Sequence, residues 1–150
     1  MSRSRELAES IVHRYLALVR YQRRKNEQIR AIADISGRQL AVLRHLVQEG
    51  PQTIGRIGRF LYVSDATTSS LLDRMERDGY VVRRRSTDDC RRVYVEPTEQ
   101  GRRAAATAPA GAIWLLRTRL PEQSPEELEQ IDRALARLSE IAGVDEEKLD

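Results

Sequence analysis

Cysteine and histidine are scarce in this sequence. The chain of 150 residues has one cysteine, Cys90, and two histidines, His13 and His45, which lie far apart. One cysteine excludes an internal disulfide, and histidines with no cysteine or carboxylate cluster at ligand spacing do not predict a metal site. The sequence also has no Ser/His/Asp or Cys/His constellation and no glycine-rich phosphate loop. We therefore expect no catalytic residues, no metal and no cofactor.

Long apolar runs are missing too. Arginine or glutamate interrupts each apolar stretch far short of the roughly 20 residues that a membrane-spanning helix needs, and the first residues lead into no signal-like segment. Aromatic residues make up 5% of the chain, whereas charged residues make up 33%. This balance is typical of a soluble, helix-rich protein with charged outer faces. We expect one compact domain, a cytoplasmic location and no membrane contact.

The charges are unevenly distributed along the chain. The formal net charge is only +3, which by itself does not select a partner. Residues 74–92, however, contain seven basic and four acidic side chains, whereas residues 122–150 contain three basic and ten acidic ones. The chain thus combines a basic middle with an acidic C-terminal segment.

Apolar residues three and four apart predict helices through the first half of the chain. Thr53 and Ser64 are suitable N-caps because their hydroxyls accept hydrogen bonds from the first helical N–H groups. Gly79 is suited to close a helix as its C-cap. The predicted helices cover residues 4–32, residues 39–48, a short segment that begins at Thr53, and a segment from Ser64 to Gly79.

A β-hairpin follows Gly79, where the pattern changes from helical to strand-like. Residues 80–85 and 91–95 resemble strands, and the polar residues 86–89 between them suit a turn. The second strand is expected to stop at Pro97, because proline has no N–H for a sheet. Arginines stand on both sides of the turn; they are Arg83, Arg84, Arg85, Arg91 and Arg92.

Helices are predicted again in the last third of the chain. Thr98 can cap an alanine-rich helix, which Pro109 and Gly111 interrupt. Ser124, with a proline next to it and Glu127 three residues later, forms a capping box for a final helix. The expected fold class is therefore mainly α with one small β-hairpin.

The order of these elements suits DNA recognition. A short helix, a tight turn and a second helix can place that second helix in a major groove, while a hairpin reaches the adjoining backbone or minor groove. Short polar side chains on the helix from Ser64 let the backbone approach base edges and phosphates. The hairpin arginines suit phosphates or a narrow minor groove. A solvated surface would explain single charges, but their clustering at one turn favours a DNA contact.

The sequence resembles the MarR family of regulators over nearly its whole length. The agreement is most specific at about residues 36–101, where the family's motifs follow in order. These are the capped recognition helix at residues 63–76, then Asp78-Gly79-Tyr80-Val81, the wing motif Asp89-Cys90-Arg91-Arg92, and Thr98-Glu99-Gln100-Gly101. The resemblance implies a winged helix-turn-helix part at about residues 36–97 and dimerisation helices at about 4–32 and 98–142.

The resemblance implies a bacterial transcription regulator, with repression as the expected mode. Such a regulator binds a pseudo-palindromic operator in double-stranded DNA as a homodimer. By the resemblance, Arg91 reaches the minor groove from the tip of the wing, and Asp89 orients it. The predicted DNA contacts are Thr53, Ser64, Asp65, Thr67, Thr68, Ser69, Arg74, Arg84, Arg85, Arg91 and Arg92.

The terminal helices carry apolar stripes that one small domain cannot cover. We expect residues 7–21 and 114–141 of two chains to interlock about a two-fold axis. The resemblance also implies a small anionic or aromatic effector, bound between the dimerisation helices and the winged part. Aromatic residues at helical spacing are often simply core, so the cleft stays a hypothesis. Its candidate residues are Tyr15, Tyr21, Arg44, Tyr62 and Trp114.

Other interpretations stay open. A winged helix can bind a protein or RNA without reading an operator. Cys90 is either a redox switch, because the neighbouring Arg91 favours the thiolate, or an exposed bystander. A metal-dependent nuclease at Asp88 and Asp89 would need further acidic partners. We interpret both histidines as structural.

Overall fold

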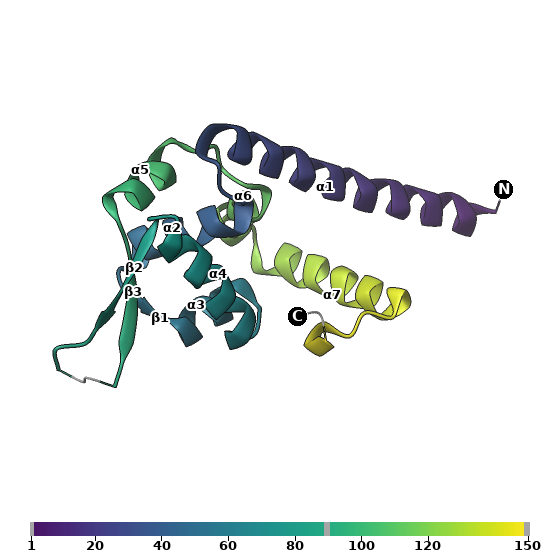
Figure 1. The fold of residues 1–150 in the computed structure, drawn as a ribbon. Coiled ribbons are helices and arrows are strands. Elements are labelled where there is room, and N and C mark those ends of the chain that lie inside the picture. The colour runs from purple at the N-terminus through teal and green to yellow at the C-terminus, as the bar shows by residue number, and fades with distance from the viewer. Residues whose placement is uncertain (1, 89–90, 149–150) are drawn as a thin grey trace.

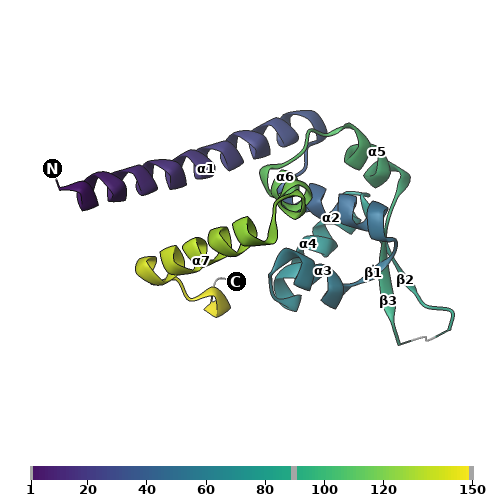
Figure 2. The same cartoon turned by 180° about the vertical axis from the view of Figure 1, so that it is seen from behind.

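The computed structural model describes residues 2–88 and 91–148. They form a helical body with a small three-stranded antiparallel sheet (Figure 1). Two long helices, α1 (Arg3–Ala33) and α7 (Pro125–Ala142), project from the body in the same direction, as the reverse view in Figure 2 also shows. The predicted fold class, mainly α with a β-hairpin, is confirmed.

The middle of the chain builds the body. Its helices are α2 (Gly37–Glu49), α3 (Ile54–Leu61), α4 (Asp65–Arg77), α5 (Glu99–Thr107) and α6 (Ala112–Arg119). Its strands are β1 (Gln52–Thr53), β2 (Val81–Arg85) and β3 (Val93–Pro97), in the order β1-β3-β2. Short 3-10 turns, η1 (Leu120–Glu122) and η2 (Glu146–Lys148), lie on either side of α7 in the sequence.

Hydroxyl caps begin the helices where the sequence predicts them. Thr53, Ser64 and Thr98 each accept a hydrogen bond from the backbone N–H three residues later. Ser124 does the same within a capping box that Glu127 completes. Each cap satisfies an N–H that the first helical turn leaves unpaired. The predicted starts of α3, α4, α5 and α7 are confirmed.

The sheet differs from the prediction in its details. β3 begins at Val93 rather than at Arg91, and it stops at Pro97 as predicted. Pro97 pairs with Val81 at the end of the ladder, where a missing N–H is tolerated. β1, which pairs Gln52 with Val95 of β3, escaped prediction because two residues form no periodic pattern. The C-cap of α4 is Asp78, and Gly79 follows it with a φ of 83°.

The hydrophobic core lies in the body, between the helices and the sheet. Its buried members are Ile29, Ile35, Leu40, Val42, Leu43, Leu46, Ile57, Leu72, Met75, Val81, Val95, Ala104 and Ala108. By contrast, residues 3–24 of α1 are exposed, and every residue of α7 is exposed or half-buried. None of the helices in the described ranges is long and apolar enough to cross a membrane. The two projecting helices thus contribute little to the core of a single chain.

Hydrogen bonds at Tyr80 and Thr98 close the base of the hairpin. The Thr98 N–H donates to the Tyr80 carbonyl (3.0 Å), and the Thr98 hydroxyl donates to the Gly79 carbonyl (2.6 Å). The Tyr80 hydroxyl donates to the Ala33 carbonyl at the end of α1 (3.0 Å). Gly101 is buried in the first turn of α5, where a Cβ would lie against the Tyr80 carbonyl oxygen. This junction joins α1, the hairpin and α5.

We expect Gly101→Ala to destabilise the protein. In an unobstructed helix this change stabilises by up to about 1 kcal/mol, but a methyl group forced against backbone costs about 1–3 kcal/mol. Circular dichroism should therefore show a Tm lowered by several degrees. Gly55→Ala is the matched control, because the nearest atom to a Cβ there is the end of the Arg59 side chain, 4.0 Å away. Equal Tm values for the two variants would contradict this packing.

Candidate functional site

Helices α3 and α4 cross closely at Gly58. A Cβ at Gly58 would lie 2.8 Å from Thr68 Oγ1 and 3.2 Å from the Val63 carbonyl oxygen, so glycine permits this approach. Thr68 is fully buried at the crossing and donates its hydroxyl to the Ser64 carbonyl at 2.8 Å. The crossing fixes the direction of α4 and leaves the opposite side of that helix open to solvent.

The open side of α4, here called its outer face, is mostly short and polar near the N-terminus. The Ser64 Oγ accepts from the Thr67 N–H (3.2 Å) and contacts the Thr67 hydroxyl (3.1 Å), which orders the first turn. Small side chains and the positive end of the helix dipole favour close approach to an anionic surface. The exposed residues of α4 are Asp65, Ala66, Ser70, Asp73, Arg74, Glu76 and Arg77, and Thr67 and Ser69 are half-buried.

The hairpin of β2 and β3 lies at the same end of the body as α3 and α4 (Figure 1), and most of its arginines are exposed. Arg84 pairs with Glu96 across the sheet at 3.0 Å, and both side chains remain partly in solvent. Arg85, Arg91 and Arg92 are exposed as well. Guanidinium groups in such positions are suited to bidentate contacts with phosphate oxygens.

Arg83 differs from these arginines because it binds α4. Its guanidinium lies 2.8 Å from the Asp73 carboxylate and 3.0 Å from that of Glu76. The Arg83 N–H also donates to Glu76 at 3.1 Å. Since only 22% of the Arg83 side chain is exposed, this residue orients the hairpin on α4 rather than offering its charge to a ligand.

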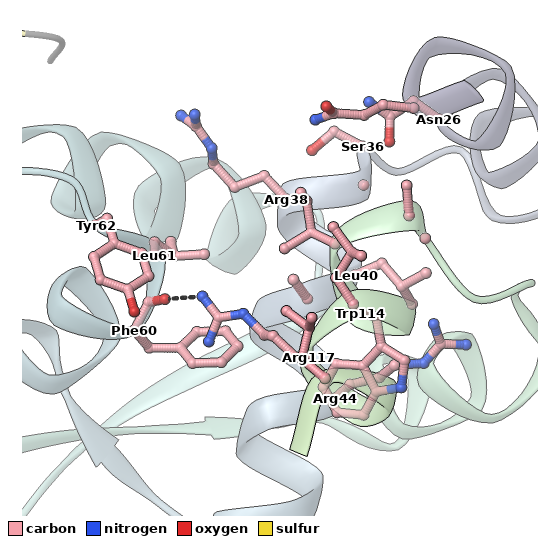
Figure 3. Close-up of a pocket in the computed structure, with 18 residues that line it drawn as sticks. Asn26, Ser36, Arg38, Leu40, Arg44, Phe60, Leu61, Tyr62, Trp114 and Arg117 are labelled. Atoms are coloured by element: carbon pink, nitrogen blue, oxygen red, sulfur yellow. Dashed lines mark hydrogen bonds between the residues drawn. The ribbon is translucent and has the colours of Figure 1, made fainter. Parts of the chain in front are cut away.

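A cavity of about 610 Å³ lies between the end of α1, α2, the end of α3, and α6 (Figure 3). This volume suits a small organic molecule. Aromatic and aliphatic walls combine with polar groups and three guanidinium groups. The residues labelled in Figure 3 are Asn26, Ser36, Arg38, Leu40, Arg44, Phe60, Leu61, Tyr62, Trp114 and Arg117.

Arg44 forms hydrogen bonds with the backbone at one side of the cavity. It donates to the carbonyls of Ala105 (3.3 Å), Ala108 (2.6 Å) and Pro109 (3.4 Å), and so caps the C-terminal end of α5. Burial lowers the pKa of Arg44 from its ordinary value. Its guanidinium also lies 5.7 Å from the centroid of the Trp114 ring. Arg44 therefore links α2 to the end of α5 and to Trp114 of α6 at this side of the cavity.

Arg117 reaches from α6 to the end of α3. Its guanidinium donates to the Phe60 carbonyl, the contact dashed in Figure 3, and lies 3.8 Å from the centroid of the Phe60 ring. His45 of α2 stacks on the same ring, with 4.0 Å between centroids and 10° between planes. Two groups this close to one ring centre must occupy opposite faces. Arg117, Phe60 and His45 thus form a three-layer stack that links α6, α3 and α2.

Sequence comparison shows which family this chain belongs to. A sequence model of the MarR family matches residues 35–93, which contain α2, α3, α4 and the first strand of the hairpin. The chain belongs to the MarR family. Its MarR-family segment therefore coincides with the helix crossing, the outer face of α4 and β2.

Relatives of known sequence or structure agree with this assignment. The chain is 34% identical over 91 residues to the organic hydroperoxide resistance transcriptional regulator of Bacillus subtilis, a match that covers 59% of this chain and 58% of that protein. It is 32% identical over 106 residues to the Bacillus subtilis HTH-type transcriptional regulator YfiV, covering 71% and 66%. The crystal structure of overoxidized AbfR bound to DNA has 26% identity and a TM-score of 0.61, covering 90% of this chain and 96% of that one.

Most of the predicted contact residues of this MarR-family chain gather around α3, α4 and the hairpin. Thr53 and Ser64 are caps, and Asp65 and Arg74 lie exposed on α4. The prediction of Thr68 as a DNA contact is wrong, because the crossing with α3 buries this residue completely. Two further predicted residues, Asp89 and Cys90, lie outside the described residues.

The predicted cleft residues are divided between two places. Arg44, Tyr62 and Trp114 line the cavity. Tyr15 and Tyr21 instead lie exposed on the projecting part of α1, apart from the described cavity lining. Their helical spacing showed that they share a face, but not whether this face meets the body.

The sequence analysis missed residues that the structure places at the cavity and beside α4. Phe60 and Arg117 come from different helices and have no shared pattern, so only packing reveals their stack. Arg56 and Arg59 of α3 are exposed near α4, and a helical plot with Ile57 inward would have marked them. No group of three or more His, Cys, Asp or Glu side chains in residues 2–88 and 91–148 is placed to hold a metal ion.

The surroundings of His45 in this stack also shift its pKa. Burial disfavours the imidazolium and lowers the His45 pKa; Glu49 opposes this shift, and the Arg117 charge adds to it. As the pH falls below the ordinary imidazole pKa of 6.5, the unfolded chain therefore binds more protons than the folded protein. Acidification through this window favours the unfolded state.

We accordingly expect acid to lower the Tm partly through His45. The Tm of the wild type should fall between about pH 7.5 and about pH 5.5, an interval that brackets the ordinary imidazole pKa. His45→Phe keeps an aromatic ring against Phe60 and should lose less Tm over this interval. His13→Gln, at an exposed position of α1, is the control. If the Tm of the wild type and that of His45→Phe fall equally over this interval, His45 does not contribute to the acid sensitivity.

Proposed function

We propose that this chain is a homodimeric transcription regulator that binds double-stranded DNA sequence-specifically, with repression as its mode. The outer face of α4 carries this proposal, because it is exposed and lies at the same end of the body as the hairpin (Figure 1), whose arginines are mostly exposed. A helix held in this way fits a major groove, and the arginines fit the phosphates or minor groove beside it. The DNA-bound structure of AbfR, at 26% identity, supports the same use of the fold.

The proposal divides the chain into two roles. Residues 36–97 read DNA, and residues 4–32 and 98–142 pair two chains. The activity is binding rather than catalysis, because a regulator of this family acts by occupying its operator. The ion pairs of Arg83 with Asp73 and Glu76 hold the hairpin at a fixed angle to α4, so both elements engage one duplex together.

Uncovered apolar side chains support the homodimer. α1 exposes Leu7, Ile11, Tyr15 and Leu18, and α7 exposes Ile131, Leu135 and Ile141. Apolar faces of this extent on two projecting helices are typical of surfaces that a partner covers. A two-fold axis through these helices would present two copies of α4 to the half-sites of a pseudo-palindrome, about 34 Å apart.

Sedimentation equilibrium tests the dimer. The wild type should show twice the chain mass of 17.2 kDa, and Ile11→Glu should shift the mass toward one chain because it places a charge in the apolar face of α1. Ala17→Glu is the control, since at 100° per residue it lies on the polar side of α1. A wild type that stays at one chain mass at micromolar concentration would contradict the dimer.

Fluorescence anisotropy tests the DNA binding. The wild type should prefer a duplex from the region upstream of its own coding sequence over a shuffled duplex, and its affinity should fall steeply with salt. Arg85→Ala should weaken binding to both duplexes and lower the salt slope by about 1, because it removes one phosphate contact. Ser70→Arg, on the outer face of α4, should instead change the ratio between the two affinities.

Arg103→Ala is the control for charge, since it removes the same guanidinium from the exposed side of α5. It should leave the affinity near that of the wild type. If Arg85→Ala and Arg103→Ala weaken binding equally, the affinity comes from net charge alone. If the wild type binds neither duplex at low salt, the winged part serves a protein or RNA partner instead.

We also propose that a small anionic or aromatic effector binds in the cavity and regulates the DNA affinity. The aromatic side chains of Phe60, Tyr62 and Trp114 suit a planar ring, and the guanidinium groups of Arg38 and Arg117 suit an anion. The cavity touches both α3 and α6, so an occupant contacts the DNA-reading part and the pairing part at once.

A further inference from the structure

α1 is attached to the body near its C-terminal end. Ile29 is fully buried in the core, and a Cβ at Gly37 of α2 would collide with the side-chain amide of Asn26, so α1 and α2 touch there. Residues 3–24 of α1 are exposed, and Figure 1 shows this part projecting from the body. The contacts of the attached end therefore fix the direction of the projecting part.

Tyr80 joins this end of α1 to the start of the hairpin. Its hydroxyl donates to the carbonyl of Ala33, the last residue of α1, at 3.0 Å. The end of a helix leaves such a carbonyl without an intrahelical partner. The Tyr80 N–H donates to the Met75 carbonyl of α4 (2.9 Å), and the Tyr80 carbonyl accepts from the N–H of Thr98, the N-cap of α5 (3.0 Å). Tyr80 is thus bonded to α1, to α4 and to the start of α5.

The hairpin and α4 are held together as one unit, here called the reading unit (α4, β2 and β3). The guanidinium of Arg83 on β2 lies 2.8 Å from the Asp73 carboxylate and 3.0 Å from that of Glu76. The Tyr80 N–H adds a backbone hydrogen bond between the start of the hairpin and α4. A change at the bond between Tyr80 and Ala33 therefore alters the angle of the whole reading unit to α1.

The length of α1 magnifies such a change of angle. Residues 3–24 extend about 33 Å at about 1.5 Å per residue, so a tilt of roughly 5° at the attached end displaces the far end by roughly 3 Å. In the proposed dimer the projecting parts of two chains pack on each other, and the same tilt then moves the two reading units relative to one another. A displacement of this size is comparable to one base-pair step of DNA, about 3.4 Å.

We propose that the Tyr80 hydroxyl is a positioning group that fixes the angle between α1 and the reading unit, and through that angle the half-site spacing that the dimer accepts. This inference rests on the proposed function, because it requires two paired chains on DNA. The Tyr80 ring packs against the core, which a phenylalanine ring could do as well. Only the hydroxyl can donate a hydrogen bond to Ala33, so the role belongs to this group rather than to the volume of the ring.

A spacing series measured by fluorescence anisotropy tests this role. It uses the duplex from the upstream region, versions with one base pair inserted or deleted at the centre, and a duplex with only one half-site. The wild type should lose about tenfold in affinity at each altered spacing. Tyr80→Phe should bind the native duplex about fivefold more weakly. It should bind the half-site as tightly as the wild type, and it should discriminate less between the spacings.

Tyr94→Phe is the matched control, because it removes the same hydroxyl from a half-buried tyrosine of the same hairpin. It should keep the spacing preference of the wild type. If Tyr80→Phe keeps that preference as well, the proposal is overturned. A Tyr80→Phe variant that binds the half-site and the native duplex more weakly by the same factor would also overturn it, since Tyr80 would then act within each chain alone.

Pulsed electron paramagnetic resonance measures the separation of the reading units without DNA. A spin label at Ser70→Cys, an exposed position of α4, in a Cys90→Ser background reports the distance between the two labels of a dimer. The distribution of this distance should be narrow, and adding Tyr80→Phe should broaden it. Equal distributions would overturn the proposal.

The outcomes distinguish this inference from the proposed function. A wild type that stays at one chain mass or binds neither duplex refutes the proposed function, and the role of Tyr80 falls with it. A wild type that dimerises and prefers the native duplex, but whose spacing preference and label distance are unchanged by Tyr80→Phe, refutes the role of Tyr80 alone.

Discussion

The close crossing of α3 and α4 at Gly58 is the contact on which the rest of the site depends. A side chain at this position would collide with Thr68 and with the backbone at Val63, and α4 would then be held at another angle. The crossing decides which side of α4 is buried, which side is open, and where Arg83 finds Asp73 and Glu76. The placement of the hairpin beside α4 follows from it.

The body and the projecting helices differ in how they bury their apolar side chains. The body has a closed core, whereas α1 and α7 leave large apolar side chains in solvent. Most of the acidic residues of the C-terminal segment belong to α7 and to η2, and α7 lies apart from the hairpin in both views. This separation leaves the hairpin as a basic region, as the proposed DNA contact requires, and it leaves the apolar side chains of the two projecting helices open for the proposed pairing.

The arginines show how far sequence reasoning reaches. Their clustering around the hairpin turn was visible in the sequence, and four of the five are exposed there. The exception, Arg83, binds two carboxylates of α4. Arg44 and Arg117 line one cavity, yet one caps α5 and the other stacks on Phe60. A long, flexible side chain takes the partner that the fold brings near, and composition cannot identify that partner.

The sequence by itself determined most of the elements, their N-caps and the family. Apolar periodicity, hydroxyl caps and turn residues act over a few positions, so α1, α3, α4, α7 and the hairpin were foreseeable. Only the tertiary structure decided that Thr68 is buried, that Tyr15 and Tyr21 stand apart from the cavity, and that Arg117, Phe60 and His45 stack. These outcomes depend on contacts between residues distant in the chain, and such contacts leave no local pattern to read.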